Sequence, residues 1–200
     1  MAQQETIPVR QDLWRLDGQV ALVTGASAGL GARFVRVLHQ AGAEVLATAR
    51  RSDRLDELAR ECGGRIEVMA GDITDASHRQ ALAERLEARG RLDVLVNNAG
   101  ICDDGPIEEQ SLEDLRQVIE VNLVSVLDMC RLTARLLLAA PAASVINIAS
   151  MYGIVASRGP MAAYNATKGA LVNLTRQLAA QWESVECEST PWLLVTSQPS

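Results

Sequence analysis

The chain has 200 residues, of which 48% are hydrophobic and 22% are charged, and these proportions are typical of a globular domain with a sizeable core. They exclude a collagen, a coiled coil and a wholly disordered chain. The 19 Lys and Arg residues against 25 Asp and Glu give a net charge of −6, and the basic residues are spread along the chain, which makes nucleic acid an unexpected partner.

From residue 19 onward, short apolar runs alternate with longer segments of helical period, which is the pattern of stacked βαβ units. Strands are expected at residues 20–24, 44–49, 66–70, 92–96 and 144–149. Helices are expected at residues 30–41, 53–61, 76–89, 112–138 and 163–182. The sequence therefore predicts an α/β fold with a parallel sheet.

The end of the chain breaks this pattern. A short apolar run from Trp192 to Val195 is flanked by turn-forming residues and supports a last strand only weakly. We therefore expect an N-terminal extension at residues 1–17, one α/β domain at residues 18–182, and an aberrant, poorly ordered tail at residues 183–200. The sheet is expected to lack its last strand or strands.

The cysteines and the N-terminus limit the kinds of site and location. The four cysteines lie far apart and the chain holds two histidines, so neither a structural zinc site nor a disulfide scaffold is expected. Residues 1–17 lack the apolar run of a signal peptide, and no stretch reaches the roughly 18 apolar residues of a membrane span. We expect a cytoplasmic protein with no metal and no membrane partner.

A glycine-rich segment joins the first predicted strand to the first predicted helix. Gly25, Gly29 and Gly31 form the spacing G-x-x-x-G-x-G, and Ser27 and Leu30 lie between them. Missing side chains at such a place let a pyrophosphate approach the backbone and the helix N-terminus. The segment lacks the Lys of a phosphate-gripping P-loop. The alternative, a turn with a purely structural role, is disfavoured by its place between strand and helix.

Three later motifs follow at the ends of predicted strands and at the start of a helix. They are Asn97-Asn98-Ala99-Gly100 after the fourth strand, Ser150 after the fifth, and Tyr164-Asn-Ala-Thr-Lys168 opening the last helix. Together with the glycine segment, and over about residues 17–182, they resemble the classical short-chain dehydrogenase/reductase family. The resemblance implies a Rossmann-type, doubly wound parallel sheet in three layers, α/β/α, and makes residues 18–182 an NAD(P)-binding Rossmann domain. It also implies a nicotinamide cofactor, a small-molecule alcohol or carbonyl substrate, and interconversion of a hydroxyl and a carbonyl group by hydride transfer.

The residue types themselves fit acid–base chemistry. Tyr164 and Lys168 are four positions apart, so on a helix they project from one face, and an ammonium group near a phenol lowers the phenol's pKa. A phenol tuned in this way becomes a usable acid or base near neutral pH. Ser150 is expected at the carboxyl end of a strand, where open α/β sheets bind ligands, and can hydrogen-bond a substrate oxygen.

The resemblance assigns these residues catalytic roles. It implies that Tyr164 is the acid/base and that Lys168 also binds the nicotinamide ribose. It implies further that Ser150 binds the substrate and that Asn122, in Glu-Val-Asn-Leu, completes a tetrad. Taken alone, Asn122 is as readily a solvated residue or a local kink in a helix. Tyr-x-x-x-Lys pairs likewise occur by chance on many helix surfaces, so only the combination with Ser150 and both glycine motifs indicates a site.

Further residues are expected to contact the cofactor. Asp72, followed by Ile73, matches the adenine-binding position of the family, although an Asp at this place could instead be a helix N-cap. Ala99 and Gly100 let the backbone turn close to the cofactor, while Asn98 can tie neighbouring strands together through its amide.

The end of the second predicted strand bears on the choice between NAD(H) and NADP(H). An Asp or Glu there would bind the ribose 2′-hydroxyl, whereas Arg would accept a 2′-phosphate. The sequence has Arg50 and Arg51 at this turn. We therefore predict NADP(H), with Arg50 as the leading phosphate contact and Arg51 as the second; two solvated arginines, with Asp53 close by, are the alternative.

The tail departs from the family pattern, which continues with a strand and an Asn-Ala-x-x-Pro-Gly loop over the nicotinamide. Codons permitted for residues 185–195, read in another frame, encode these missing features, so we predict a frameshift near residues 183–185 in the gene or its sequencing. The chain is then expected to be weakly active or inactive. A non-catalytic dinucleotide-binding or interaction protein is the alternative function. By resemblance, the helices at residues 112–138 and 163–182 would assemble the complete protein into a homodimer or homotetramer.

Overall fold

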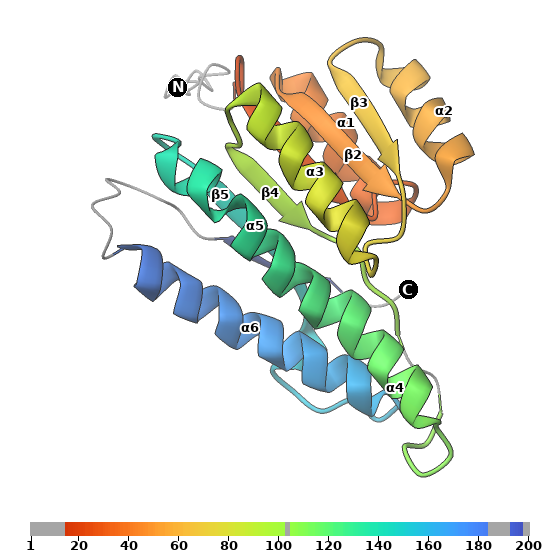
Figure 1. Cartoon of the computed structure of the whole chain (residues 1–200). Helices are drawn as coiled ribbons and strands as arrows, with labels where there is room; N and C mark the ends of the chain where they lie inside the picture. Colours follow the sequence, from red (N-terminus) through yellow and green to blue (C-terminus); the bar gives the residue numbers. More distant parts are fainter. Residues whose placement is uncertain (1–14, 103–104, 184–192, 198–200) are drawn as a thin grey trace, which may run out of the picture.

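The computed structural model describes residues 15–102, 105–183 and 193–197 (Figure 1). Within them, the strands form one sheet in the order β3-β2-β1-β4-β5-β6, with every neighbouring pair parallel. The strands are β1 (Val20–Thr24), β2 (Glu44–Ala49), β3 (Ile66–Ala70), β4 (Val94–Asn97), β5 (Ser144–Ser150) and β6 (Leu193–Ser197).

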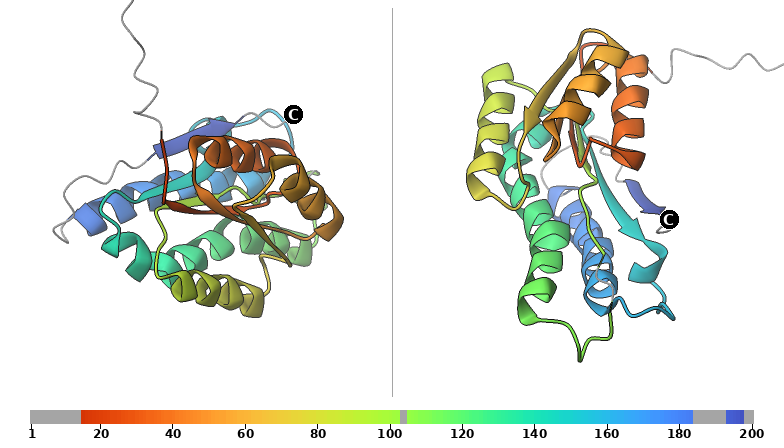
Figure 2. Two further views of the ribbon diagram at one scale, coloured as in Figure 1. Left: turned by 90° about the horizontal axis from the view of Figure 1, so that it is seen from above. Right: turned by 90° about the vertical axis from the view of Figure 1, so that its right-hand side faces the viewer.

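Helices cover both faces of this sheet (Figure 2). They are α1 (Gly29–Ala41), α2 (Ser52–Cys62), α3 (Ala76–Arg89), α4 (Leu112–Ile119), α5 (Ser125–Ala139) and α6 (Ala162–Glu183), with a π-helical segment at Glu120–Val124 and a short 3₁₀ helix at Met151–Gly153. One face carries α1 and α2, and the other carries α3, α5 and α6. The predicted three-layer Rossmann fold is confirmed.

Alternating side chains of strands β1 to β5 divide the core in two. In β1, the fully buried Leu22 points into a cluster that includes Leu86 of α3, while its neighbour Val23 packs with Val35 of α1 on the opposite face. A strand buried on both faces reads as a continuous apolar run, which is the pattern that predicted a parallel sheet. The two layers of helices are thus held by the hydrophobic effect on either side of the same strands.

The predicted helix at residues 112–138 forms as two α-helices joined without a break by the π-helical segment. A π-bulge accommodates an extra residue within a helical turn, and such bulges occur frequently at functional sites. Asn122 lies in the middle of this one. Of the alternatives for Asn122, a solvated position is wrong, because Asn122 is fully buried.

One expectation about the end of the chain needs correction. A strand does follow the last long helix: β6 pairs with β5, with Leu193 opposite Ile146 and Ser197 opposite Ser150. The short apolar run there gains its strand structure from the backbone groups of β5, which no local pattern reveals. At the other end, the Leu16 N–H donates to the Ala41 carbonyl at 2.8 Å. Residues 1–14, 184–192 and 198–200, with Cys187 and the proposed frameshift, lie outside the described residues.

The strand order reverses between β1 and β4, and loops leave their carboxyl ends in opposite directions. In open α/β sheets, ligands bind in the crevice at such a switch point. The Thr24 hydroxyl, at the end of β1, accepts hydrogen bonds from the backbone N–H groups of Asn98 and Ala99 at 3.0 and 3.1 Å. The segments that follow β1 and β4 are therefore tied together at the place where a ligand is expected.

The turn that follows β5 lies directly against the backbone of α6. A Cβ added to Gly153 would lie 2.6 Å from the Lys168 carbonyl oxygen, closer than real Cβ atoms approach backbone. Glycine at this position therefore lets the end of β5 and the start of α6 approach each other. Because α6 carries Tyr164 and Lys168, this contact sets their position relative to the sheet.

We expect Gly153→Ala to lower the free energy of unfolding by about 1–3 kcal/mol, because the added methyl group forces a backbone shift in a packed region. The matched control is Gly159→Ala, whose added Cβ would approach only the flexible end of Met161 at 3.2 Å and the Ser157 hydroxyl at 3.4 Å. Urea unfolding measures the free energy of unfolding of both variants. Equal stability of the two variants would contradict the proposed close approach.

Candidate active site

A cavity of about 820 Å³ opens at the carboxyl ends of the strands around the switch point. It is lined from the glycine segment at one side to the start of α6 at the other. All residues predicted to bind the cofactor line it: Gly25, Ser27, Gly29, Leu30, Gly31, Arg50, Arg51, Asp72, Ile73, Asn98, Ala99, Gly100, Tyr164 and Lys168. The structure thus brings five separate segments of the chain to one place, while the role of each residue stays a prediction.

The two glycine motifs fit into each other. The Asn98 side-chain amide donates to the carbonyl oxygens of Thr24 and Gly25 at 2.9 and 3.2 Å, which is the tie between strands expected of this residue. A Cβ on Gly25 would lie 2.8 Å from the Ala99 Cα. These contacts leave no room for a side chain at Gly25 and hold the floor of the cavity in one conformation.

The N-terminus of α1 supplies a place for an anion. Its N-cap residue is Ala28, whose methyl group cannot accept a hydrogen bond, and residues 28–31 line the cavity. Gly29 has φ +53°, and a Cβ built on it would meet no described atom within 4 Å. Helix N–H groups without a side-chain cap, together with the helix dipole, suit a phosphate or pyrophosphate. The residues present therefore fit a dinucleotide.

Asp72 and its neighbours form one wall of the cavity. The Asp72 carboxylate accepts hydrogen bonds from the Thr74 N–H at 2.9 Å and from the Thr74 hydroxyl at 2.8 Å. These bonds, led by that of the backbone N–H, lower the pKa of Asp72. The alternative reading of Asp72 as a helix N-cap is wrong, because Asp75 caps α3 by accepting from the Ser77 N–H.

Arg50 and Arg51 both line the cavity and are exposed. The Arg51 guanidinium donates to the Ser27 hydroxyl from two nitrogens, at 3.2 and 3.0 Å, and so bridges the end of β2 and the glycine segment. Two guanidinium groups beside the glycine segment suit a phosphate ester better than a free hydroxyl.

Tyr164 and Lys168 lie together at the start of α6. Both are buried, and the Lys168 Nζ lies 5.5 Å from the centroid of the Tyr164 ring. The Lys168 ammonium donates to the Ile148 carbonyl of β5 at 2.5 Å. One helical turn separates the two residues, as their spacing predicted, and both line the cavity. A phenol and a cation are thus held at one end of a space that can take a dinucleotide.

Burial changes the titration of Lys168. Removal from water disfavours the charged form and lowers its pKa from 10.5 to about 8, while a charge interaction with Cys102 raises it by a smaller amount. Since this value stays above 7, the ammonium form predominates at neutral pH. Lys168 is therefore a cation in an apolar setting, where its field acts strongly on neighbouring groups.

The other two predicted catalytic residues lie behind the wall of this cavity. Asn122 accepts from the Ile101 N–H and donates to the Ile101 carbonyl, both at 2.8 Å, and also donates to the Thr167 hydroxyl of α6 at 3.2 Å. Ser150, at the end of β5, is fully buried, and its hydroxyl accepts from the Tyr152 N–H at 3.2 Å. Neither side chain is among those that line the cavity.

Sequence reasoning missed several residues of the cavity wall. Gly71, Ile101 and Cys102 directly adjoin predicted motifs, so their proximity could have indicated them. Ile148 contributes through its backbone carbonyl, and no side-chain signal exists for such a contact. The missed lining residues are Ala28, Thr48, Ala49, Gly71, Ile101, Cys102, Gln117, Val121 and Ile148.

Two other features are absent from the part of the chain that the structure describes. No helix there is both long and apolar enough to cross a membrane. In the same residues, no group of three His, Cys, Asp or Glu side chains is placed to hold a metal ion.

One known protein family matches most of this chain. The model of the short chain dehydrogenase family matches residues 19–188. The chain belongs to this family. It is therefore an oxidoreductase of the short-chain dehydrogenase family, as its motifs predicted, and the cavity lies where a Rossmann fold binds a nicotinamide dinucleotide.

Individual relatives agree with this assignment. D-threitol dehydrogenase of Mycolicibacterium smegmatis is 36% identical over 91% of this chain and 71% of its own. A gluconate 5-dehydrogenase of Burkholderia cenocepacia, crystallised with NADP and tartrate, is 34% identical, with a TM-score of 0.78 over 86% of this chain and 69% of its own. A short-chain dehydrogenase of Burkholderia phymatum in complex with NAD is 31% identical, with a TM-score of 0.83 over 90% of this chain and 65% of its own.

The lowered pKa of Lys168 predicts a specific pH dependence of stability. Between about pH 8 and 10.5, the unfolded chain binds more protons at this residue than the folded one, so the free energy of unfolding rises with pH across that window. The difference between the two pKa values corresponds to about 3 kcal/mol. Urea unfolding of the unaltered chain and of Lys168→Met at several pH values isolates this contribution, because other titrating groups act equally on both. Parallel pH profiles would contradict the buried cation.

Proposed function

We propose that this chain is an NADP(H)-dependent oxidoreductase that interconverts a secondary hydroxyl and a carbonyl group, with Tyr164 as the acid/base. The observation that carries the proposal is the buried pair of Tyr164 and Lys168 at one end of a cavity whose other end is built from the glycine segment. The glycine segment and helix α1 are suited to the pyrophosphate, and the pair is suited to move a proton.

When bound, the nicotinamide ring supplies or accepts the hydride. The protein must then deliver or remove one proton at the substrate oxygen. In the reductive direction, the Tyr164 hydroxyl donates that proton to the carbonyl oxygen, and in the oxidative direction the Tyr164 oxygen accepts it. The Lys168 cation lies over the Tyr164 ring, and the Ile148 carbonyl holds the cation in place.

Asn122 and Ser150 support this arrangement from behind the wall. The bonds from Asn122 to Ile101 and Thr167 hold the segment after β4 against α6, which carries Tyr164. Ser150 ends β5, two residues beyond Ile148, and in the proposed role its hydroxyl turns from the Tyr152 N–H toward the substrate oxygen.

The nature of the relatives supports a substrate class. D-threitol and gluconate are small polyhydroxylated compounds, and they name two of the related enzymes. We propose that the substrate of this chain is likewise a secondary alcohol of a small polyol or sugar acid, or the corresponding ketone. Solved relatives hold either NADP or NAD, so they do not decide between the two cofactors. The preference for NADP(H) is supported by the two arginines at the cavity edge.

The acid/base role is tested by Tyr164→Phe, which removes one oxygen and keeps the ring. We expect turnover to fall by about 10²- to 10⁴-fold, the usual contribution of general acid–base catalysis, while NADPH affinity changes little. Tyr152→Phe is the matched control and should retain activity. Rates follow from the absorbance of the reduced nicotinamide with polyol and sugar-acid substrates. Unchanged turnover in Tyr164→Phe would exclude the proposed role.

Cofactor preference is tested by Arg50→Gln, which removes one positive charge from the edge of the cavity. We expect the Kd for NADPH to rise by about tenfold, the value of one charge-assisted hydrogen bond, with little change in the Kd for NADH. Arg33→Gln on the exposed part of α1 is the control, because Arg33 does not line the cavity. Tighter binding of NADH than NADPH by the unaltered chain would overturn the preference.

A further inference from the structure

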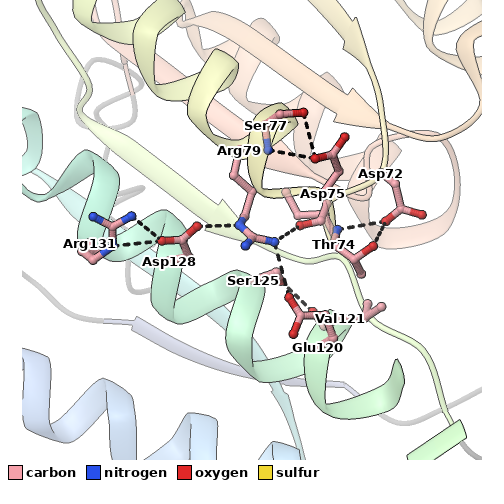
Figure 3. Close-up of polar contacts among 11 residues, drawn as sticks. Asp72, Thr74, Asp75, Ser77, Arg79, Glu120, Val121, Ser125, Asp128 and Arg131 are labelled. Carbon is pink, nitrogen blue, oxygen red and sulfur yellow. Dashed lines mark hydrogen bonds and ion pairs between the residues drawn. The ribbon is translucent and has the colours of Figure 1, made fainter. Parts of the chain in front are cut away.

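One buried guanidinium group joins two walls of the cavity. Arg79 of α3 is only 5% exposed. Its Nη1 donates to the Ile73 carbonyl at 2.8 Å, and its Nε donates to the Asp128 carboxylate of α5 at 2.6 Å. The same Nη1 lies 3.6 Å from the Glu120 carboxylate at the start of the π-helical segment (Figure 3). Arg79 thus contacts three acceptors on three different segments.

The first wall is the segment between β3 and α3, which carries Asp72 and Ile73 into the cavity. Hydrogen bonds within the segment fix most of its backbone: the Asp75 N–H donates to the Asp72 carbonyl at 3.0 Å, and the Thr74 N–H donates to the Asp72 carboxylate. Arg79 supplies the donor for the carbonyl of Ile73. The orientation of the Ile73 peptide therefore depends on the position of this side chain.

The second wall belongs to the helix that contains the π segment. Glu120 begins that segment, and Val121, the next residue, lines the cavity. Further along, Asp128 bonds both Arg79 and the exposed Arg131 (Figure 3). Burial alone would raise the pKa of Asp128, but the hydrogen bonds from Arg79 and Arg131 together hold it below its usual value. Asp128 is thus a carboxylate that anchors Arg79 to this helix.

The chemistry of arginine suits a link between these walls. A guanidinium is planar and presents several donors in fixed directions, whereas a lysine ammonium acts as a compact point charge. Burying the ion pair is itself a weak source of stability, because both charges lose their hydration. The specific gain at this place is geometric, since Arg79 links the Ile73 carbonyl to Glu120, the neighbour of Val121, and Ile73 and Val121 both line the cavity.

We infer that Arg79 is a positioning residue that sets the separation of the two walls of the cavity at its adenosine end, and thereby the affinity for the adenosine part of the dinucleotide. The inference rests on the proposed function, and the adenosine end is the part of the cavity beside Asp72 and Ile73, which the family resemblance matches to the adenine of the cofactor. Arg79 itself does not line the cavity and acts through the backbone of Ile73 and through Glu120 and Asp128.

Helix α3 offers a matched control for this test. Arg85 also forms a fork with a carboxylate, donating to the two oxygens of Glu67 at 2.6 and 2.9 Å. Its side chain is 49% exposed, and neither Arg85 nor Glu67 lines the cavity. Changes at Arg85 therefore remove an arginine–carboxylate pair from the same helix without touching either wall.

The experiment compares Arg79→Lys and Arg79→Met with Arg85→Lys and Arg85→Met in the full chain. Fluorescence titration gives the Kd for NADPH and for 2′,5′-ADP, which carries only the adenosine end. Both Arg79 variants should raise both Kd values by about tenfold, the usual size of a lost buried charge-assisted contact, while the Arg85 variants stay near the unaltered value. A folded Arg79→Lys that binds both nucleotides like the unaltered chain would overturn the inference.

Amide hydrogen exchange provides a readout that needs no nucleotide. Residues 71–75 and 120–124 should exchange faster in Arg79→Lys than in Arg85→Lys, because the link between the walls is lost. If the unaltered chain failed to bind NADPH, the proposed function would fall, and faster exchange at these residues would still support the positioning role. Unchanged exchange, or failure of both Arg79 variants to fold, would assign Arg79 to overall stability and overturn it.

Discussion

The buried ammonium group of Lys168 is the constraint on which the chemical end of the cavity depends. Its side chain is 4% exposed, and the loss of hydration is large enough to bring its pKa down to about 8. The Ile148 carbonyl at 2.5 Å and the face of the Tyr164 ring offset part of that loss. Since Ile148 belongs to β5 and Lys168 to α6, satisfying one cation fixes the strand against the helix.

Two other segments lie close to the Lys168 ammonium group. A Cβ added to Gly100, after β4, would lie 3.5 Å from the Lys168 Nζ and 3.4 Å from the Asn122 Oδ1. Asn122 in turn reaches Ile101 and Thr167 because the π-helical segment carries it into the interior. The ends of β4 and β5, the π segment and α6 therefore converge on a few atoms. A change in any one of them moves the environment of Tyr164.

The sequence predicts those parts of the molecule that depend on local patterns. The glycine segment, the Tyr-x-x-x-Lys spacing and the alternation of strands and helices each act over a few residues, and the elements lie close to where they were expected. The π segment was not predicted, because one extra residue in a helical turn hardly alters the period of the apolar residues. In the sequence, nothing distinguishes Arg79 from a solvent-facing arginine of α3. Its burial depends on contacts with distant residues such as Asp128, 49 positions away. Strand β6 likewise depends on the distant edge of β5.

The two ends of the cavity are held by different kinds of interaction. In the proposed function, the residues that choose between NAD and NADP are therefore different from those that move the proton. At the end beside the glycine segment, the proposed phosphate contacts are helix N–H groups and the exposed Arg50 and Arg51, whose charges are screened by salt and free to change without repacking. At the chemical end, buried Lys168 and Asn122 are locked to backbone carbonyls, so any substitution disturbs several segments at once. A scaffold of this kind can exchange NAD for NADP at its edge and still keep one proton-transfer geometry in its interior.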